Sequence, residues 1–211
     1  MSYSDALGIQ LQIAAERKQG LGVDHLLFVE HHPHVVTIGR NGHEENLLAP
    51  EAALRAAGVE LHETDRGGDV TYHGPGQVVA YPIMDLREWK RDVGAFVRGI
   101  EQVLIDVLGD FGIEARRIAK LTGVWVGEAK IGAIGVHLSR WVSTHGWALN
   151  VSTDLRYFDY IVPCGIAKPV TSMAALGVLA DTEDVKNALV RRFGQIFEFE
   201  MQAEPALTGR F

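Results

Sequence analysis

The sequence has very little cysteine, with a single thiol, Cys164, in 211 residues. One cysteine cannot form an internal disulfide, and a zinc site built from several thiolates is excluded as well. No apolar run approaches the roughly 18 residues of a membrane-spanning helix, and the stretch MSYSDALGIQ lacks the basic and apolar regions of a signal peptide. We therefore expect a cytoplasmic protein, with no membrane partner, whose thiol stays reduced.

Basic residues and phosphate-binding motifs are also scarce. The formal net charge is -7, whereas nucleic-acid binders usually carry a basic domain, so we expect no nucleic-acid partner. Neither GxxxxGK[ST] nor GxGxxG after a strand is present, which argues against a nucleotide loop. Small basic clusters occur at residues 87–91 and 116–120. Clusters of this size are more often solvated surface than binding sites.

What is present is typical of one globular domain, with 47% hydrophobic and 22% charged residues, so we expect a single domain over residues 1–211. Apolar periodicity predicts helices over residues 3–18, 92–113 and 182–199, and Pro50 at a first-turn position with Gly58 at the end predicts a short helix over 50–58. Alternation predicts strands at 25–30 and 34–40, on either side of a turn at Pro33, and at 59–65 and 78–86, with an antiparallel meander over 123–126, 130–138 and 142–151. This order predicts an α/β or α+β fold with a mixed, largely antiparallel sheet.

Residues 66–77, RGGDVTYHGPGQ, contain four glycines and one proline. Glycine permits positive φ angles and a close approach of the backbone to a ligand. The segment is therefore either a tight connection between two strands or a loop that grips a substrate. In the second interpretation Arg66, Tyr72 and His73 are the chemically active side chains.

The strand predicted at residues 130–138 has small residues at Gly132, Ala133 and Gly135. A bare strand face either lets a helix pack closely or forms a slot for an aliphatic chain. Lys130 begins this strand, and taken alone it reads as a solvated surface charge.

Three histidines occur in EHHPH, residues 30–34. Neighbouring strand residues point to opposite faces, and no HExxH motif or cysteine accompanies them, so we expect no metal site. We interpret His62, His137 and His145 as ordinary strand residues.

Cys164 lies between Pro163 and Gly165. Free cysteine is most often a buried small hydrophobe. Its two neighbours, however, are turn formers that suit a loop, and loops commonly present reactive groups. Cys164 is therefore also a candidate nucleophile.

Three longer segments follow in order: RGGDVTYHGPGQVVAYP at residues 66–82, KIGAIGVHLSRWVSTHGWALNV at 130–151 and IVPCGIAKPVTSM at 161–173. Together they resemble the lipoyl(octanoyl) transferase family, the octanoyl-[acyl carrier protein]:protein N-octanoyltransferases. The resemblance starts near Pro33 and covers about two thirds of the chain. It departs from the family pattern in EHHPHVVTIGR, where His34 replaces a usual second proline and Val36 a usual aromatic residue.

The resemblance implies a fold shared with biotin protein ligases and lipoate ligases. It also implies transfer of an octanoyl group from octanoyl-acyl carrier protein to a lysine of lipoyl domains of oxo-acid dehydrogenases and of the glycine-cleavage H protein, without a cofactor. The catalytic pair that it implies is Cys164 and Lys130. The residues that it implies for the acyl chain are Arg66, Gly67, Gly68, Asp69, Val70, Thr71, Tyr72, His73, Ala133, Ile134, Gly135, Gly146, Trp147 and Ala148.

Three alternatives remain at the level of sequence. A lipoate or biotin ligase would activate a free acid with ATP, but the patterns RRxSGGGxVYHDxGN and GRGRxG are absent. An amidotransferase would move octanoyl between two protein lysines, also through a cysteine. An inert module that only holds acyl carrier protein would make Cys164 structural.

Overall fold

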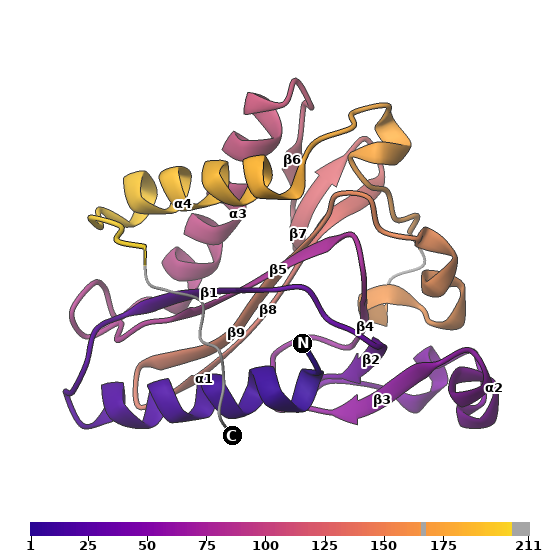
Figure 1. Ribbon diagram of the computed structural model, residues 1–211, viewed down its shortest axis with the longest axis horizontal. Helices are drawn as coiled ribbons and strands as arrows, with labels where there is room; N and C mark the ends of the chain where they lie inside the picture. Colours follow the sequence, from indigo (N-terminus) through magenta and orange to yellow (C-terminus); the bar gives the residue numbers. More distant parts are fainter. Residues whose placement is uncertain (166–167, 204–211) are drawn as a thin grey trace.

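Two β-sheets form the centre of the chain (Figure 1). The computed structural model describes residues 1–165 and 168–203, apart from the side chain of Cys164. Within these residues the larger sheet has six strands, and each neighbouring pair is antiparallel. In spatial order they are β1 (His25–Val29), β5 (Gln77–Ile83), β9 (Val142–Asn150), β8 (Ala129–Ser139), β7 (Leu121–Val126) and β6 (Arg116–Ile118).

The smaller sheet contains β3 (Val59–Glu63), β2 (His34–Ile38) and β4 (Val70–His73), in that order. Strand β2 pairs in parallel with β3 and antiparallel with β4. The predicted α+β class with a mixed, largely antiparallel sheet is therefore confirmed, with the strands divided between two sheets. The two strands predicted around Pro33 both form, but β1 belongs to the larger sheet and β2 to the smaller one.

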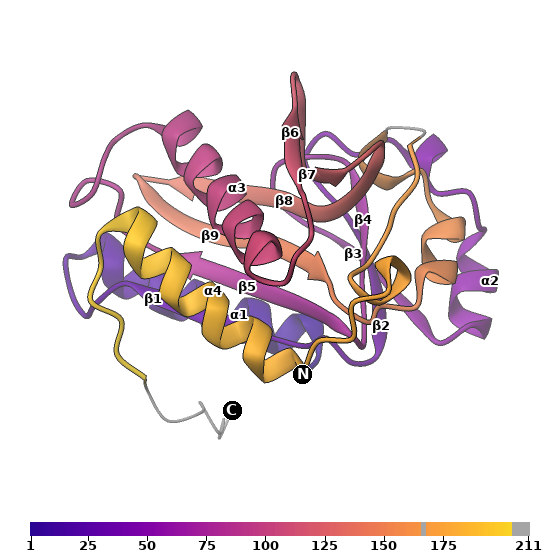
Figure 2. The same cartoon turned by 90° about the horizontal axis from the view of Figure 1, so that it is seen from above.

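Helices cover both faces of the larger sheet (Figure 2). Helix α1 (Tyr3–Lys18) packs Ala6, Ile9 and Ile13 on one face, while α3 (Val93–Asp110) and α4 (Thr182–Phe197) pack on the other. The short helix α2 (Glu51–Ala56) buries Leu54 against the smaller sheet. Each predicted helix forms. None of the described helices is both long and apolar enough to span a membrane.

Helix starts follow from local chemistry. The Ser2 hydroxyl accepts a hydrogen bond from the Asp5 amide, and the Asp92 carboxylate accepts one from the Ala95 amide. Asp181 caps α4 in the same way. Short polar side chains at these positions satisfy amides that have no partner within the helix.

The glycine-rich segment at 66–77 is not a continuous connection. Its middle forms strand β4, which pairs with β2 in a regular antiparallel register. Both interpretations of this segment missed the strand, because the flanking glycines obscure the short run VTYH. Four short 3-10 helices complete the described elements: η1 (Glu44–Asn46), η2 (Leu155–Tyr160), η3 (Pro163–Gly165) and η4 (Ala174–Leu176).

Candidate active site

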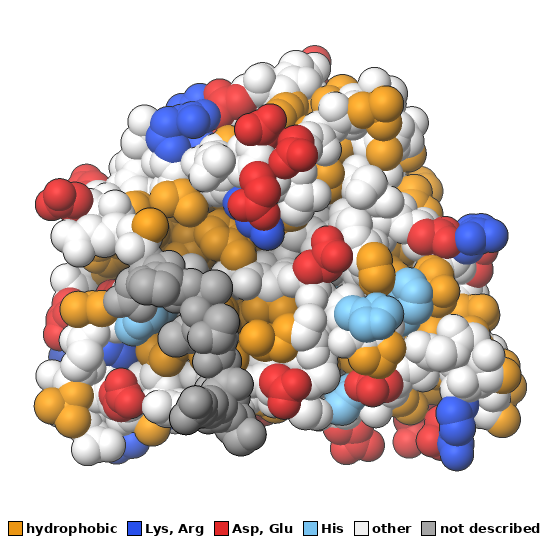
Figure 3. All heavy atoms as spheres, in the orientation of Figure 1, with side chains coloured by type: hydrophobic (Ala, Val, Ile, Leu, Met, Phe, Trp, Pro, Cys, Tyr) orange, Lys and Arg blue, Asp and Glu red, His pale blue; other side chains and the backbone are white. Residues whose placement is uncertain are grey.

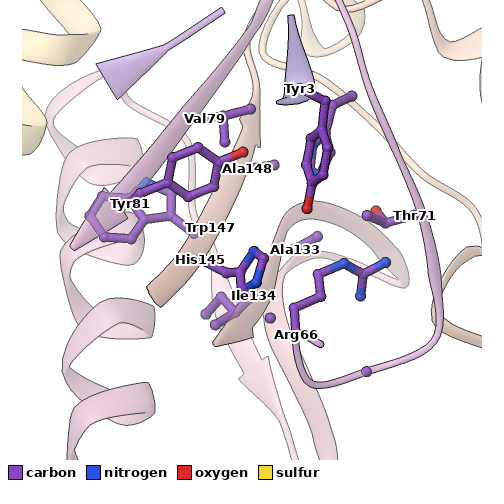
Figure 4. A pocket seen from close by; sticks show the side chains of 14 residues that line it. Tyr3, Arg66, Thr71, Val79, Tyr81, Ala133, Ile134, His145, Trp147 and Ala148 are labelled. Atoms are coloured by element: carbon purple, nitrogen blue, oxygen red, sulfur yellow. The ribbon is translucent and has the colours of Figure 1, made fainter. Parts of the chain in front are cut away.

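A cavity of about 450 Å³, including its opening, lies between the larger sheet, the start of α1 and the loop before β4 (Figure 4). Most of its lining belongs to the predicted acyl-binding set: Arg66, Gly68, Thr71, His73, Ala133, Ile134, Gly135, Gly146, Trp147 and Ala148. The remaining lining residues were not predicted: Tyr3, Val79, Tyr81 and His145. The structure thus brings together most of the residues expected from distant motifs.

The floor of the cavity is a row of small side chains on three adjacent strands. Ala148 on β9 pairs with Val79 on β5 and with Ala133 on β8, so the three residues lie side by side. Residues directly opposite one another in a sheet point to the same face. This floor is apolar, which suits an aliphatic chain.

Strand β4 divides its residues between two environments because side chains alternate along a strand. Thr71 and His73 line the cavity, whereas Val70 and Tyr72 belong to the core of the smaller sheet. Tyr72 therefore lies away from the cavity. Its hydroxyl forms a 2.8 Å hydrogen bond with His34 Nδ1. The histidine that departs from the family pattern at position 34 therefore supplies the partner of this hydroxyl.

Arg66 holds the loop in front of β4. Its guanidinium donates to the Thr37 hydroxyl at 2.8 Å and to the Thr37 and Asp69 carbonyl oxygens at 2.7 and 2.6 Å. The Gly67 amide donates to the Val136 carbonyl at 3.0 Å, which attaches the loop to β8. A Cβ at Gly135 would lie only 2.7 Å from the Gly67 oxygen. Glycine at 135 therefore allows this loop to pack directly against β8.

Asp69 lies beside the segment that carries Cys164. Its carboxylate accepts hydrogen bonds from the His43 amide at 3.1 Å and the Asn46 side-chain amide at 2.6 Å. A Cβ built on Gly165 would lie 2.5 Å from Asp69 Oδ2. Asp69 thus faces the 3-10 turn Pro163–Gly165 and does not line the cavity.

Lys130 is buried, with 5% of its surface exposed, so it is not the solvated surface charge that its isolated position suggested. Its ammonium lies 4.8 Å from the centroid of the buried Trp125 ring, within the range of a cation–π contact. Its backbone bonds with Pro169 and Thr171 tie β8 to the chain that follows Cys164.

Lys130 and Pro163 line a second, smaller space of about 280 Å³. It shares Thr71 and Ala133 with the larger cavity, so the two spaces adjoin. The Cys164 side chain lies outside the described part of the structure, but its backbone follows Pro163 directly in η3. Lys130 and Pro163, the chain neighbour of Cys164, therefore line the same space, which adjoins the larger cavity.

Two buried histidines are neutral at physiological pH. Burial lowers the pKa of His73 to about 3 and that of His31 to about 4. The Gln77 side-chain oxygen can only accept a hydrogen bond, so His73 Nδ1 donates to it at 2.7 Å. His73 Nε2 then carries no proton and cannot donate to a substrate oxygen in this state.

His145 was interpreted as an ordinary strand residue, and the structure assigns it to the cavity wall. Its φ of 57° is unusual for a residue other than glycine. Its Nε2 donates to Asp65 at 2.7 Å, and its amide donates to Gln10 of α1 at 2.8 Å. Burial lowers the pKa of His145, although the Asp65 carboxylate opposes that effect. No local sequence pattern indicates these long-range partners.

The basic clusters at 87–91 and 116–120 are partly neutralised. Arg87 pairs with Asp85, Arg116 with Glu128 and Arg117 with Glu101. Figure 3 shows acidic and basic side chains interspersed on one face of the molecule. Among the described residues, no group of three or more potential ligands could hold a metal ion.

Comparison with known proteins identifies the family. Residues 2–194 match the model of the lipoyl protein ligase A/B catalytic domain, which is nearly the whole chain. The chain belongs to this family.

Several relatives match almost the full length. The octanoyltransferase of Solibacter usitatus is 68% identical over 95% of this chain and 91% of its own. Those of Koribacter versatilis and Chloroflexus aurantiacus are 51% and 48% identical, over 94% and 97% of this chain and 81% and 93% of their own. These relatives confirm the resemblance and the expected enzyme class, an acyltransferase.

Solved structures confirm the lipoate ligase fold. A lipoate-protein ligase A bound with ATP superposes with a TM-score of 0.75 at 18% identity, covering 93% of this chain and 83% of that one. The putative lipoate protein ligase Ta0514 from T. acidophilum, with bound lipoic acid, gives 0.73 at 18% identity, covering 92% and 83%. At such low identity the likeness extends to the fold alone.

Proposed function

We propose that the protein moves an octanoyl group from octanoyl-acyl carrier protein to the target lysine of lipoyl domains, through a thioester on Cys164. Acceptors of this class are the lipoyl domains of oxo-acid dehydrogenases and the glycine-cleavage H protein. The octanoyltransferase relatives support octanoyl as the group transferred. The reaction serves the first step of lipoyl cofactor assembly in the cytoplasm.

The observation that supports this proposal is the buried Lys130 in a space that adjoins the larger cavity. One space contains Pro163, the neighbour of Cys164, and the other is an apolar cavity with the floor Val79, Ala148 and Ala133. A thiolate in the smaller space would share that space with the Lys130 ammonium and would have a slot for an acyl chain next to it. Nucleophilic acyl transfer needs both features.

Electrostatics explains how the thiol becomes reactive. An unperturbed cysteine has a pKa near 8.5, so only a small fraction is thiolate at neutral pH. An ammonium about 4 Å away contributes about 4 kcal/mol at an effective dielectric constant of 20, before desolvation is subtracted. Even half of that energy lowers the thiol pKa by more than one unit.

The reaction then proceeds in two balanced steps. The Cys164 thiolate attacks the octanoyl carbonyl, the new thioester forms, and the phosphopantetheine thiolate leaves and takes a proton from Lys130. The neutral amine of the incoming lysine then attacks the thioester, Lys130, now neutral, accepts the proton that this nitrogen loses, and the amide forms as the Cys164 sulfur leaves. The thiolate of Cys164 is regenerated, and one lysine serves both half-reactions.

The tetrahedral intermediate needs hydrogen-bond donors for its oxyanion. Neutral His73 with its proton on Nδ1 is directed to Gln77 and does not supply one. Backbone amides near Cys164 are therefore the donors that we propose.

Intact mass spectrometry tests the proposal directly. The purified protein is mixed with octanoyl-acyl carrier protein in the absence of ATP, in parallel with a Cys164→Ala variant. We expect one octanoyl adduct on the wild-type chain alone, which is lost on addition of hydroxylamine or of lipoyl domain.

The alternatives predict other outcomes. Labelling of lipoyl domain only with free octanoate and ATP would indicate a ligase. A preference for an octanoylated protein lysine as donor would indicate an amidotransferase. A Cys164→Ala variant with unchanged function would indicate a binding module.

A further inference from the structure

Tyr81 and His145 close the end of the cavity that lies away from Lys130. Tyr81 is 3% exposed and His145 2% exposed, so both belong to the interior. Figure 4 shows Tyr81 and Thr71 on opposite sides of the cavity, with Ala148 and Ala133 between them. Since Thr71 and Ala133 also line the space at Lys130, Tyr81 lies at the far end.

Hydrogen bonds hold this wall in place. The Tyr81 hydroxyl lies 2.6 Å from Nε2 of the buried His31, and the rings of Tyr81 and His145 meet edge to face at 6.5 Å. His145 is held by Asp65 through its ring and by Gln10 through its amide. Such fixed side chains can exclude a longer ligand, because moving them would break buried hydrogen bonds.

The loop before β4 closes the remaining route along the sheet. The next position on the same face of β8 after Ala133 is Gly135, and the Gly67 oxygen lies only 2.7 Å from where a Cβ of Gly135 would be. The neighbouring residue on β9 is Gly146, which pairs with Gly135. On the β8 side of the slot, the loop therefore lies over the floor at the position that follows Ala133.

Strand β5 provides a scale for the length of the slot. Gln77 lines the space at Lys130, Val79 lies in the floor, and Tyr81 lies at the end wall. From Gln77 to Tyr81 the strand advances by about 13 Å, given about 3.4 Å per residue. The last carbon of a bound chain must stay about 4 Å from the atoms of the wall. About 9 Å of the slot is therefore available to the chain itself.

An acyl chain can be compared with this space. With C–C bonds of about 1.5 Å, an extended chain advances about 1.25 Å per carbon, so an octanoyl group spans about 9 Å. Two further methylenes would press against the Tyr81 ring. Hydrophobic slots discriminate strongly when an added methylene has no room.

We propose that Tyr81 and His145 form the end wall that limits the acyl chain to about eight carbons, the length that fits the space along β5. The proposal rests on the proposed acyl transfer and adds the residues that set chain length.

Acyl carrier protein loaded with hexanoyl, octanoyl, decanoyl or dodecanoyl groups tests the wall, with kcat/KM for transfer to a lipoyl domain as the readout. In Tyr81→Val we expect the decanoyl-to-octanoyl ratio to rise by about tenfold or more. Ala148→Val narrows the floor before the wall, and we expect its preference to shift toward hexanoyl. Val107→Ala, a core truncation on α3 away from the cavity, should keep the wild-type length profile.

The same variants are also compared by titration calorimetry, which measures their affinity for free octanoate, decanoate and dodecanoate. This measurement does not depend on acyl transfer. Wild-type protein that transfers no acyl group at all would contradict the proposed function, while a calorimetric shift in Tyr81→Val would still support the wall. An unchanged length preference in Tyr81→Val, by kinetics and by calorimetry, would overturn the wall. If Tyr81→Val does not fold, the milder truncation Tyr81→Leu takes its place in both measurements.

Discussion

At the scale of single residues, the candidate site relies on polar groups held in apolar surroundings. Lys130 shows this most clearly, because its aliphatic stem passes over Gly123 and its ammonium faces Trp125. A Cβ at Gly123 would lie 3.4 Å from Lys130 Cε and 2.7 Å from the Gly132 oxygen. Glycine at 123 is therefore required by its φ of 122° and by the close Gly132 oxygen, while the contact with the lysine stem is of ordinary length.

Replacing Lys130 by Ala should make Cys164 less acidic. Removal of the ammonium takes away stabilisation of the thiolate, so we expect the thiol pKa to rise by about one unit or more. The inflection in the rate of iodoacetamide alkylation against pH should move upward by the same amount. Lys168→Ala is the matched control, because Lys168 is partly exposed and pairs with Glu128. An alkylation profile equal to that of wild type would remove Lys130 from the mechanism.

At the scale of elements, hydrogen bonds on both sides anchor the segment that carries Cys164. Before it, the Val162 amide donates to the Asn46 carbonyl at 2.7 Å, and after it the Lys130 amide donates to the Pro169 carbonyl at 2.9 Å. Gly165 has a φ of 64° and lies against Asp69. The backbone near the thiol is thus set by three separate parts of the chain.

Gly165→Ala should damage acyl transfer more than it damages folding. The new Cβ would overlap Asp69 Oδ2 and displace the 3-10 turn, so we expect initial transfer rates to fall by about tenfold or more. Stability should fall by about 1–2 kcal/mol, the cost of a left-handed conformation without glycine.

Gly177→Ala is a close control for this change. Its φ of 82° imposes similar strain, but a Cβ there would meet nothing within 4 Å. We expect it to lose similar stability in urea denaturation while keeping its transfer rate. Equal rates in the two variants would show that the contact with Asp69 does not matter.

At the scale of the whole molecule, a layer of buried histidine and tyrosine lies where α1 and the two sheets meet. The rings of His31 and His73 are 5.6 Å apart, and those of Tyr3 and His31 are 5.4 Å apart. Burial raises the pKa of Tyr3 to about 12, so its hydroxyl stays neutral as well. The packing of these elements therefore depends on uncharged rings.

Stability should fall as the pH is lowered. In the folded state the pKa values of His73 and His31 are about 3 and about 4, below the ordinary 6.5. Below pH 6.5 the unfolded chain binds protons that the folded chain does not, so the free energy of unfolding decreases as pH falls. We expect a loss of several kcal/mol between about pH 7 and pH 4, measured by urea denaturation.

A double variant, His31→Gln with His73→Gln, separates this effect from the titration of carboxylates. The comparison is made between about pH 6.5 and pH 5, where most carboxylates stay ionised. The variant should lose most of the pH dependence there. A wild-type stability that is constant over this range would contradict neutral buried histidines.

Local patterns in the sequence predict most of the helices and strands of this protein. Helices at 3–18, 92–113 and 182–199 follow from apolar periodicity and capping residues, and the meander follows from alternation, because both depend on neighbours along the chain. The resemblance to a family pointed to Cys164, Lys130 and most of the cavity lining. These predictions needed no knowledge of which strands pair.

Contacts between distant segments were decided by the tertiary structure. Strand β4 forms because β2 supplies its partner, and the alternation along it directs Tyr72 away from the cavity and His73 toward it. The positions of Tyr3, Tyr81 and His145 at one cavity depend on how α1 packs against β5 and β9. Nothing in their local sequence records this, because a side chain is buried or reactive according to what the rest of the fold places around it.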